Sequence, residues 1–206
     1  AEASYNNTRQ CLEVLLKYHY PVCISTKSTL ILRDMDILSR IAEDSWCTVG
    51  VTITTLDTKL ARFLEPRAPA PEKRLEVVKE IKKRYPIIQV GVNFIPIVPF
   101  LGDSDENMEK MAIATKGAGA DFILFGGGMT MRDNQASWFM KSLSQEFPHL
   151  VEKFKDLYQG KYTPAEGYQG RYEPQRHYLK QIHRRMLGLC EKYELNFRLR
   201  RYIPDD

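Results

Sequence analysis

Short runs of apolar and β-branched residues alternate along the chain with longer stretches in which apolar residues recur every three or four positions. The short runs predict β-strands, and the longer stretches predict amphipathic helices. We expect strands at residues 22–26, 47–54, 87–95 and 121–125. We expect helices at residues 7–19, 30–43, 58–64 and 72–84, from Ser104 or Asp105 to Gly117, and near residues 134–145.

Because strand and helix alternate, we expect parallel strands that are joined by right-handed crossovers and buried on both faces. Strands spaced about 25 to 35 residues apart suit either a barrel or a doubly wound sheet, and the periodicity does not distinguish the two. The pattern therefore predicts an α/β fold with a parallel sheet.

The alternation stops after Phe147 and Pro148. We expect a short helix at residues 149–158, a stretch rich in glycine, proline and tyrosine at 160–174, a long amphipathic helix that ends at Tyr193, and a final segment at 196–203. The chain is thus expected to form a main unit at residues 1–146 and a C-terminal helical extension at 147–206 that packs on it.

Composition adds three limits. With 206 residues, of which 43% are hydrophobic, the chain is too long for a peptide module and can bury a sizeable core. The formal net charge of +4 permits nucleic-acid contact without requiring it. No signal peptide and no apolar run of membrane-spanning length is present, so we expect a cytoplasmic protein.

The first residue is Ala1 and no strand precedes the first helix, which suggests a cut end.

The four cysteines, Cys11, Cys23, Cys47 and Cys190, lie far apart. No two of them have the spacing of metal ligands, so the sequence predicts no metal site of its own. We expect reduced, buried thiols, two of them inside strands, where a thiol behaves as a small hydrophobic group.

Four ordered motifs carry a resemblance to a known family. They are Ile24-Ser25-Thr26-Lys27-Ser28, Val51-Thr52-Ile53-Thr54-Thr55-Leu56-Asp57, Leu64-Glu65-Pro66-Arg67-Ala68-Pro69, and residues 92–103. In these motifs the chain resembles the radical S-adenosylmethionine superfamily, in the DNA repair photolyase and spore photoproduct lyase-like branch. The resemblance runs from about Tyr5 to Gly126. Beyond it, only the long helix with Leu179, His183 and Arg184 is similar.

The resemblance implies a partial (β/α) barrel of the TIM type with its N-terminal strands absent. In the family, a CxxxCxxC loop holds a [4Fe-4S] iron-sulfur cluster to which S-adenosylmethionine binds, and this chain has no such loop. The implied function is therefore the C-terminal part of a lyase-like enzyme that generates a 5′-deoxyadenosyl radical for hydrogen abstraction in the intact protein. We expect the 206 residues alone to be inactive.

Site residues are expected where strands end and helices begin, because ligands of α/β proteins collect at that edge. Thr52 and Thr54 alternate with apolar residues and so should share one side of the sheet. The resemblance implies that Lys27 binds the carboxylate of S-adenosylmethionine, with Thr52, and less strongly Thr54, as further contacts. It also implies that the end of the third strand packs against the adenine, with apolar surface from Ile95 and Val92, while Asn93 could donate to the ligand or substrate. Each of these residues also has a structural alternative, such as a solvent-facing lysine, a strand-forming threonine or a prolyl turn at a strand end, and no catalytic residue is identified.

The glycines from Gly126 to Gly128 admit two interpretations. A triple glycine could cradle a phosphate in an ordinary barrel enzyme, although it lacks the GxGxxG spacing. By the resemblance, Gly126 instead lets the adenine approach the main chain. In the Glu65-Pro66-Arg67 motif, Arg67 could reach the mouth of the barrel or pair with Glu65.

A second set of residues could contact DNA through a basic, aromatic surface. The set comprises His183, Arg184, Arg185, Arg198, Arg200 and Arg201, with Tyr162, Tyr168, Tyr172 and Tyr178. Such charge runs are more often solvated helix faces. The main rival to the enzyme is a non-catalytic truncated barrel that binds a nucleotide or a protein partner and has no cluster.

Overall fold

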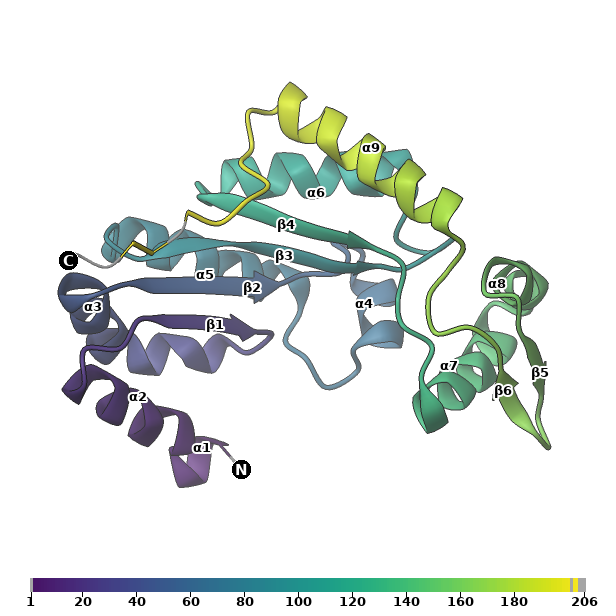
Figure 1. Ribbon diagram of the computed structural model, residues 1–206, viewed down its shortest axis with the longest axis horizontal. Helices are drawn as coiled ribbons and strands as arrows, with labels where there is room; N and C mark the ends of the chain where they lie inside the picture. Colours follow the sequence, from purple (N-terminus) through teal and green to yellow (C-terminus); the bar gives the residue numbers. More distant parts are fainter. Residues whose placement is uncertain (1, 201, 204–206) are drawn as a thin grey trace.

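A four-stranded parallel sheet forms the centre of the protein, whose computed structural model describes residues 2–200 and 202–203 (Figure 1). The strands, in their order in the sheet, are β1 (Val22–Thr26), β2 (Cys47–Thr52), β3 (Gln89–Ile97) and β4 (Phe122–Gly127). Ile24 lies opposite Val49, which in turn lies opposite Val90. The parallel α/β sheet expected from the alternation is confirmed.

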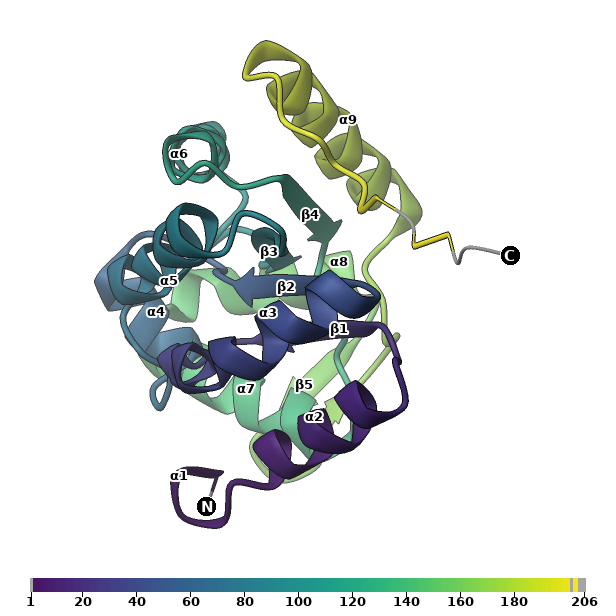
Figure 2. The same ribbon diagram turned by 90° about the vertical axis from the view of Figure 1, so that its left-hand side faces the viewer.

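The helices between the strands that pack on the sheet lie along one of its faces (Figure 2). The helices of this part are α2 (Asn7–Lys17), η1 (Thr29–Asp34), α3 (Met35–Asp44), α4 (Thr58–Leu64), α5 (Pro71–Arg84) and α6 (Asp105–Gly117). Helix α5 packs on β2 and β3, and α6 packs on β3 and β4, whereas α2 packs on α3. The apolar strand residues that alternate toward these helices, such as Val49, Val51 and Val90, are fully buried.

The opposite face of the sheet is more polar and is open at β1. It carries Cys23 and Ser25 on β1, Thr48 and Gly50 on β2, and Asn93 on β3. Cys23 and Ser25 are exposed. The expectation of burial on both faces is therefore wrong for β1, because β1 is an edge strand and the connecting helices cover the other face.

The C-terminal region contains α7 (Asp133–Glu146), η2 (Pro148–Leu150), α8 (Val151–Leu157), β5 (Lys161–Thr163), β6 (Gly167–Gln169) and α9 (Arg176–Lys192). Strands β5 and β6 form an antiparallel hairpin within the stretch rich in glycine, proline and tyrosine. The hairpin packs on α7, where the Tyr168 N–H donates to Ser137 Oγ over 2.8 Å. Helix α9 packs against β4 and α6 (Figure 1).

The division of the chain into two units at residue 146 stays a prediction. No described helix has the length and apolar character needed to cross a membrane.

Two of the four thiols are buried and two are exposed. Cys47 in β2 and Cys190 in α9 are buried, whereas Cys11 and Cys23 are exposed, and none forms a disulfide. The expectation of four buried thiols is therefore wrong for Cys11 and Cys23, which lie on faces that no other element covers. Burial raises the pKa of Cys47 to about 12 and that of Cys190 to about 11.

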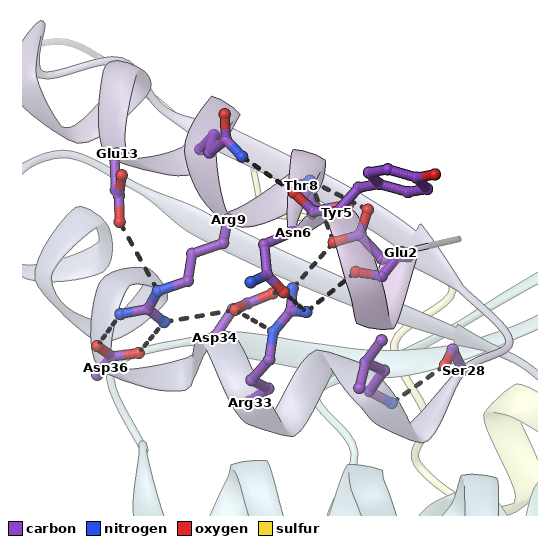
Figure 3. Close-up of polar contacts among 12 residues, drawn as sticks. Glu2, Tyr5, Asn6, Thr8, Arg9, Glu13, Ser28, Arg33, Asp34 and Asp36 are labelled. Carbon is purple, nitrogen blue, oxygen red and sulfur yellow. Dashed lines mark hydrogen bonds and ion pairs between the residues drawn. The ribbon is translucent and has the colours of Figure 1, made fainter.

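Charged residues attach the N-terminal helices to the start of α3 (Figure 3). Asp34 is 2% exposed and lies between Arg33, which donates two hydrogen bonds to it at 2.8 and 2.7 Å, and Arg9 at 3.4 Å. Arg9 also donates to both oxygens of the exposed Asp36, and these bonds lower the pKa of Asp36 to about 2. Arg33 reaches Glu2 in α1 (Glu2–Tyr5) over 2.9 Å. Asp34 is thus the shared anion of two guanidinium groups.

We expect two of the four thiols to react with an aromatic disulfide reagent in the native protein at pH 8. Cys11 and Cys23 should react within minutes, while Cys47 and Cys190 should react only in guanidinium chloride, because burial keeps them protonated and inaccessible. The released chromophore counts the thiols. Four fast thiols in the folded protein would contradict this arrangement.

We expect Asp34→Asn to lower the free energy of unfolding by about 2 kcal/mol, because the amide carries no charge and keeps only one oxygen to accept the two partly buried hydrogen bonds from Arg33. Urea denaturation followed by circular dichroism measures the change. Asp36→Asn is the matched control and should cost less than about 1 kcal/mol, because Asp36 is exposed to solvent. Equal losses for both variants would count against the central role of Asp34.

Candidate functional site

A cavity of about 360 Å³ lies at the carboxyl ends of the strands. Its wall includes Lys27 after β1, Thr54 after β2, and Ile95 within β3. The residues after β4 and helix α7 close the other side with Met129 and Trp138. Parallel strands bring their carboxyl ends to one edge of the sheet, which explains why residues so distant in sequence meet here.

Lys27 is placed by the turn that follows β1. The Ser28 N–H donates to Thr26 Oγ1 over 3.0 Å, and Ser28 Oγ in turn accepts from the Leu30 N–H at the start of η1. The Lys27 side chain is 48% exposed, and its Nζ lies 3.4 Å from Glu65 Oε1. The ammonium therefore lies at the cavity wall beside a carboxylate.

Glu65 is held by a buried arginine that the sequence analysis missed. Arg74 in α5 is 1% exposed, and its Nη1 lies 2.6 Å from Glu65 Oε2 and donates to the Thr52 carbonyl oxygen over 2.8 Å. Arg67 is exposed and lines a neighbouring groove, so the partner of Glu65 is Arg74. A signal for Arg74 was present, since it occupies the same helical face as Val77, Val78 and Ile81.

Thr52 is the last residue of β2 and Thr54 follows the strand, and their side chains have different environments. Thr54 lines the cavity, is 2% exposed, and its Oγ1 has no hydrogen-bond partner in the described part of the chain. Thr52 is half-buried, lies opposite Asn93 in the sheet, and is not part of the cavity wall. A buried hydroxyl without a partner is costly unless a ligand or water pairs with it. The geometry thus favours Thr54 over Thr52 as a contact for a ligand in this cavity.

Asn93 lies on the open face of the sheet and crosses over β2. Its Nδ2 donates to Ser25 Oγ on β1 over 3.0 Å, and its Oδ1 is buried without a partner. Gly50 lies directly beneath, where a Cβ atom would come within 2.4 Å of Asn93 Nδ2. Glycine at position 50 is therefore required for the amide to span from β3 to β1.

Gly126 lies beside Ile95, since a Cβ at Gly126 would contact that side chain at 3.6 Å. Ile95 is 43% exposed and lines the cavity, so these two expected residues are neighbours. Gly128 has φ +76° and its N–H donates to the Ile97 carbonyl oxygen over 2.9 Å. Because that N–H is already used, the interpretation of the glycines as a phosphate cradle loses one of its donors.

The residues considered for DNA contact do not form one surface. Tyr178 is buried and donates to Asp103 over 3.0 Å, and burial together with the Asp103 charge raises the pKa of its hydroxyl group. Arg185 donates to Asp105 over 2.8 Å. Arg200 lies over the Trp46 ring, which precedes β2, whereas Tyr168 lies in the β5–β6 hairpin that packs on α7. Arg201 lies outside the described residues.

No group of three or more histidine, cysteine, aspartate or glutamate side chains within residues 2–200 and 202–203 is placed to hold a metal ion.

Comparisons with known proteins give relatives without an assigned activity. No family model matches the chain. Uncharacterized proteins of Mycobacterium bovis and Mycobacterium tuberculosis are 29% identical to it over 176 residues, which cover 85% of this chain and 48% of each relative. An uncharacterized protein of Methanocaldococcus jannaschii is 33% identical over 106 residues, which cover 50% of this chain and 37% of that protein. The chain thus spans at most about half the length of these relatives.

Among solved structures, the chain is similar to Streptococcus suis SuiB, whose crystal structure contains the bound precursor peptide SuiA. The TM-score is 0.48 and the sequence identity is 13%, over 74% of this chain and 33% of SuiB.

We expect Gly50→Ala to lower the free energy of unfolding by about 1–3 kcal/mol, because the new methyl group overlaps the Asn93 amide. The double variant Gly50→Ala with Asn93→Ala should recover most of this loss, since it removes the atoms that clash. Urea denaturation of both single variants and the double variant gives the coupling. Additive losses would show that Asn93 does not lie over Gly50.

Proposed function

We propose that this chain is the C-terminal part of a radical S-adenosylmethionine enzyme and that the cavity at the strand ends binds S-adenosylmethionine. One observation carries the proposal. The Lys27 ammonium and the partnerless Thr54 hydroxyl, both expected as cofactor contacts, line the same cavity. The motifs that resemble the DNA repair photolyase and spore photoproduct lyase-like branch supply the choice of ligand.

The charges at the cavity favour an anionic group. Glu65 is the acidic residue of the wall, and the buried Arg74 already compensates its charge over 2.6 Å. Lys27 therefore provides a surplus positive charge beside the cavity. A carboxylate can bind there because the ammonium offers three N–H donors.

The remaining wall suits the rest of S-adenosylmethionine. Thr54 Oγ1 would pair with a polar atom of the amino-acid or ribose part, while Ile95, Met129 and Trp138 offer apolar surface to the adenine. Thr52, Asn93 and Gly126 lie next to this wall and would support it. The cavity of about 360 Å³ lies in the range of small-molecule sites, roughly 300–1,000 Å³.

When bound at an iron-sulfur cluster, S-adenosylmethionine supplies a 5′-deoxyadenosyl radical that abstracts hydrogen from a substrate. The described residues include no set that fits such a cluster, so we assign this chain no electron-transfer step. Its share is to bind and orient the cofactor and to keep water from the reacting end. The cluster ligands would have to come from outside the 206 residues, and these residues alone are expected to be inactive.

The second candidate is a non-catalytic module that binds a nucleotide or a partner. It is compatible with the same cavity, because the apolar surface of Ile95, Met129 and Trp138 could receive the base of a nucleotide as well as the adenine of S-adenosylmethionine. The two candidates differ in what the cavity recognises. The first requires the amino-acid part of the cofactor, whereas a nucleotide-binding module would accept 5′-methylthioadenosine equally well.

We expect the chain to bind S-adenosylmethionine in isothermal titration calorimetry and to bind 5′-methylthioadenosine more weakly. Lys27→Met should weaken binding about tenfold and Thr54→Val about fivefold, because each removes one hydrogen bond to the ligand. Lys59→Met, which removes an exposed lysine of α4, is the matched control and should leave affinity unchanged.

Folded chain that binds no S-adenosylmethionine up to about 1 mM would overturn the proposal, since such weak binding corresponds to less than about 4 kcal/mol. Equal affinities for S-adenosylmethionine and 5′-methylthioadenosine would favour the nucleotide-binding module instead.

A further inference from the structure

We infer that Glu65, fixed by the buried Arg74, is a positioning residue that holds the Lys27 ammonium at the cavity. The inference rests on the proposed function, since it concerns how the same site receives an anion. The two carboxylate oxygens of Glu65 contact different partners. Oε2 lies 2.6 Å from Arg74 Nη1, and Oε1 lies 3.4 Å from Lys27 Nζ.

Arg74 fixes the position of the Glu65 carboxylate. Its side chain is 1% exposed and is tied to the end of β2 by the hydrogen bond to the Thr52 carbonyl oxygen. A buried guanidinium cannot remain without a counter-charge at low cost, so it keeps Glu65 turned inward. The Glu65 side chain is accordingly only 10% exposed. The carboxylate is thus a fixed point at the wall of the cavity.

Lys27 is the solvent-exposed partner of Glu65. Its side chain is 48% exposed and carries a strongly hydrated ammonium on a flexible stem, which by itself favours open solvent. Attraction to Glu65 offsets this preference and brings the ammonium to the wall. At 3.4 Å the contact is an ion pair rather than a hydrogen bond. The N–H groups of Lys27 therefore remain available to a ligand carboxylate.

The inference makes a prediction opposite to that of simple electrostatics. Removing a negative charge beside an anion site should by itself strengthen anion binding. If Glu65 positions Lys27, then Glu65→Gln should instead weaken the binding of S-adenosylmethionine. The same change should have no effect where Lys27 is already absent, because Glu65 acts through that side chain.

The first experiment is a double-mutant cycle measured by calorimetry with S-adenosylmethionine. Glu65→Gln should weaken binding about fivefold in the wild-type background and less than about twofold in the Lys27→Met background. The control is Glu72→Gln, which removes an exposed carboxylate of α5. Unchanged or tighter binding by folded Glu65→Gln would overturn the inference. Equal losses in both backgrounds would do the same, because they would indicate a merely structural role.

The second experiment does not depend on S-adenosylmethionine. A carbodiimide links a carboxylate to an amine only when the two are in contact, so the folded chain should give a Lys27–Glu65 amide that mass spectrometry detects. Arg74→Met should reduce its yield several-fold while the chain remains folded by circular dichroism. Where that variant does not fold, Arg74→Lys, which keeps the charge but not the forked geometry, should reduce the yield partly.

The two experiments separate the two proposals. If the wild-type chain gives the amide but binds no S-adenosylmethionine, the proposed function fails and the positioning of Lys27 by Glu65 stands. If no amide forms in the folded wild-type chain, the positioning inference is overturned even where the cofactor binds.

Discussion

The buried guanidinium of Arg74 constrains the geometry of the whole strand-end edge. The side chain of Arg74 is 1% exposed within the helix layer, so its charge requires polar partners. It donates to the Thr52 carbonyl oxygen at the end of β2 and forms an ion pair with Glu65. These contacts join α5, the end of β2 and the segment after α4. Because Glu65 also contacts Lys27 after β1, a single buried charge links the ends of two neighbouring strands with the wall of the cavity.

The open face of the sheet is arranged by a different constraint, the absence of side chains. Gly50 lets the Asn93 amide cross β2 and reach Ser25, and Gly91 makes room for the Phe122 ring, which a Cβ would meet at 2.6 Å. A side chain that passes over a neighbouring strand needs a small residue on that strand, because strands in a sheet lie only about 5 Å apart. The open face therefore owes its polar contact between β3 and β1 to Gly50, whereas Gly91 accommodates an apolar ring.

The helix face and the N-terminal attachment follow from burial and charge. Fully buried valines of β2 and β3 pack against α5, while Asp34 joins Arg33 and Arg9 and so attaches α1 and α2 beside α3 (Figure 3). The buried carboxylate of Asp34 is paired with two guanidinium groups, as the cost of burying a charge requires. Among the described residues, the buried side-chain atoms without a hydrogen-bond partner include Thr54 Oγ1 and Asn93 Oδ1 near the strand ends. They also include Arg74 Nε and Glu65 Oε2, although this oxygen lies at ion-pair distance from Arg74 Nη1.

The sequence by itself determined the parallel α/β sheet, the order of strands and helices along the chain, and helix α4 at residues 58–64, because hydrophobic periodicity is a local signal. It also predicted that Lys27, Thr54 and Ile95 share one edge, since parallel strands impose this. It did not reveal the pairing of Glu65 with Arg74, the exposure of Cys23 or the hairpin at residues 161–169. These depend on which faces meet in space, and only the tertiary structure decides whether a charge is buried against a carboxylate or a strand face stays uncovered.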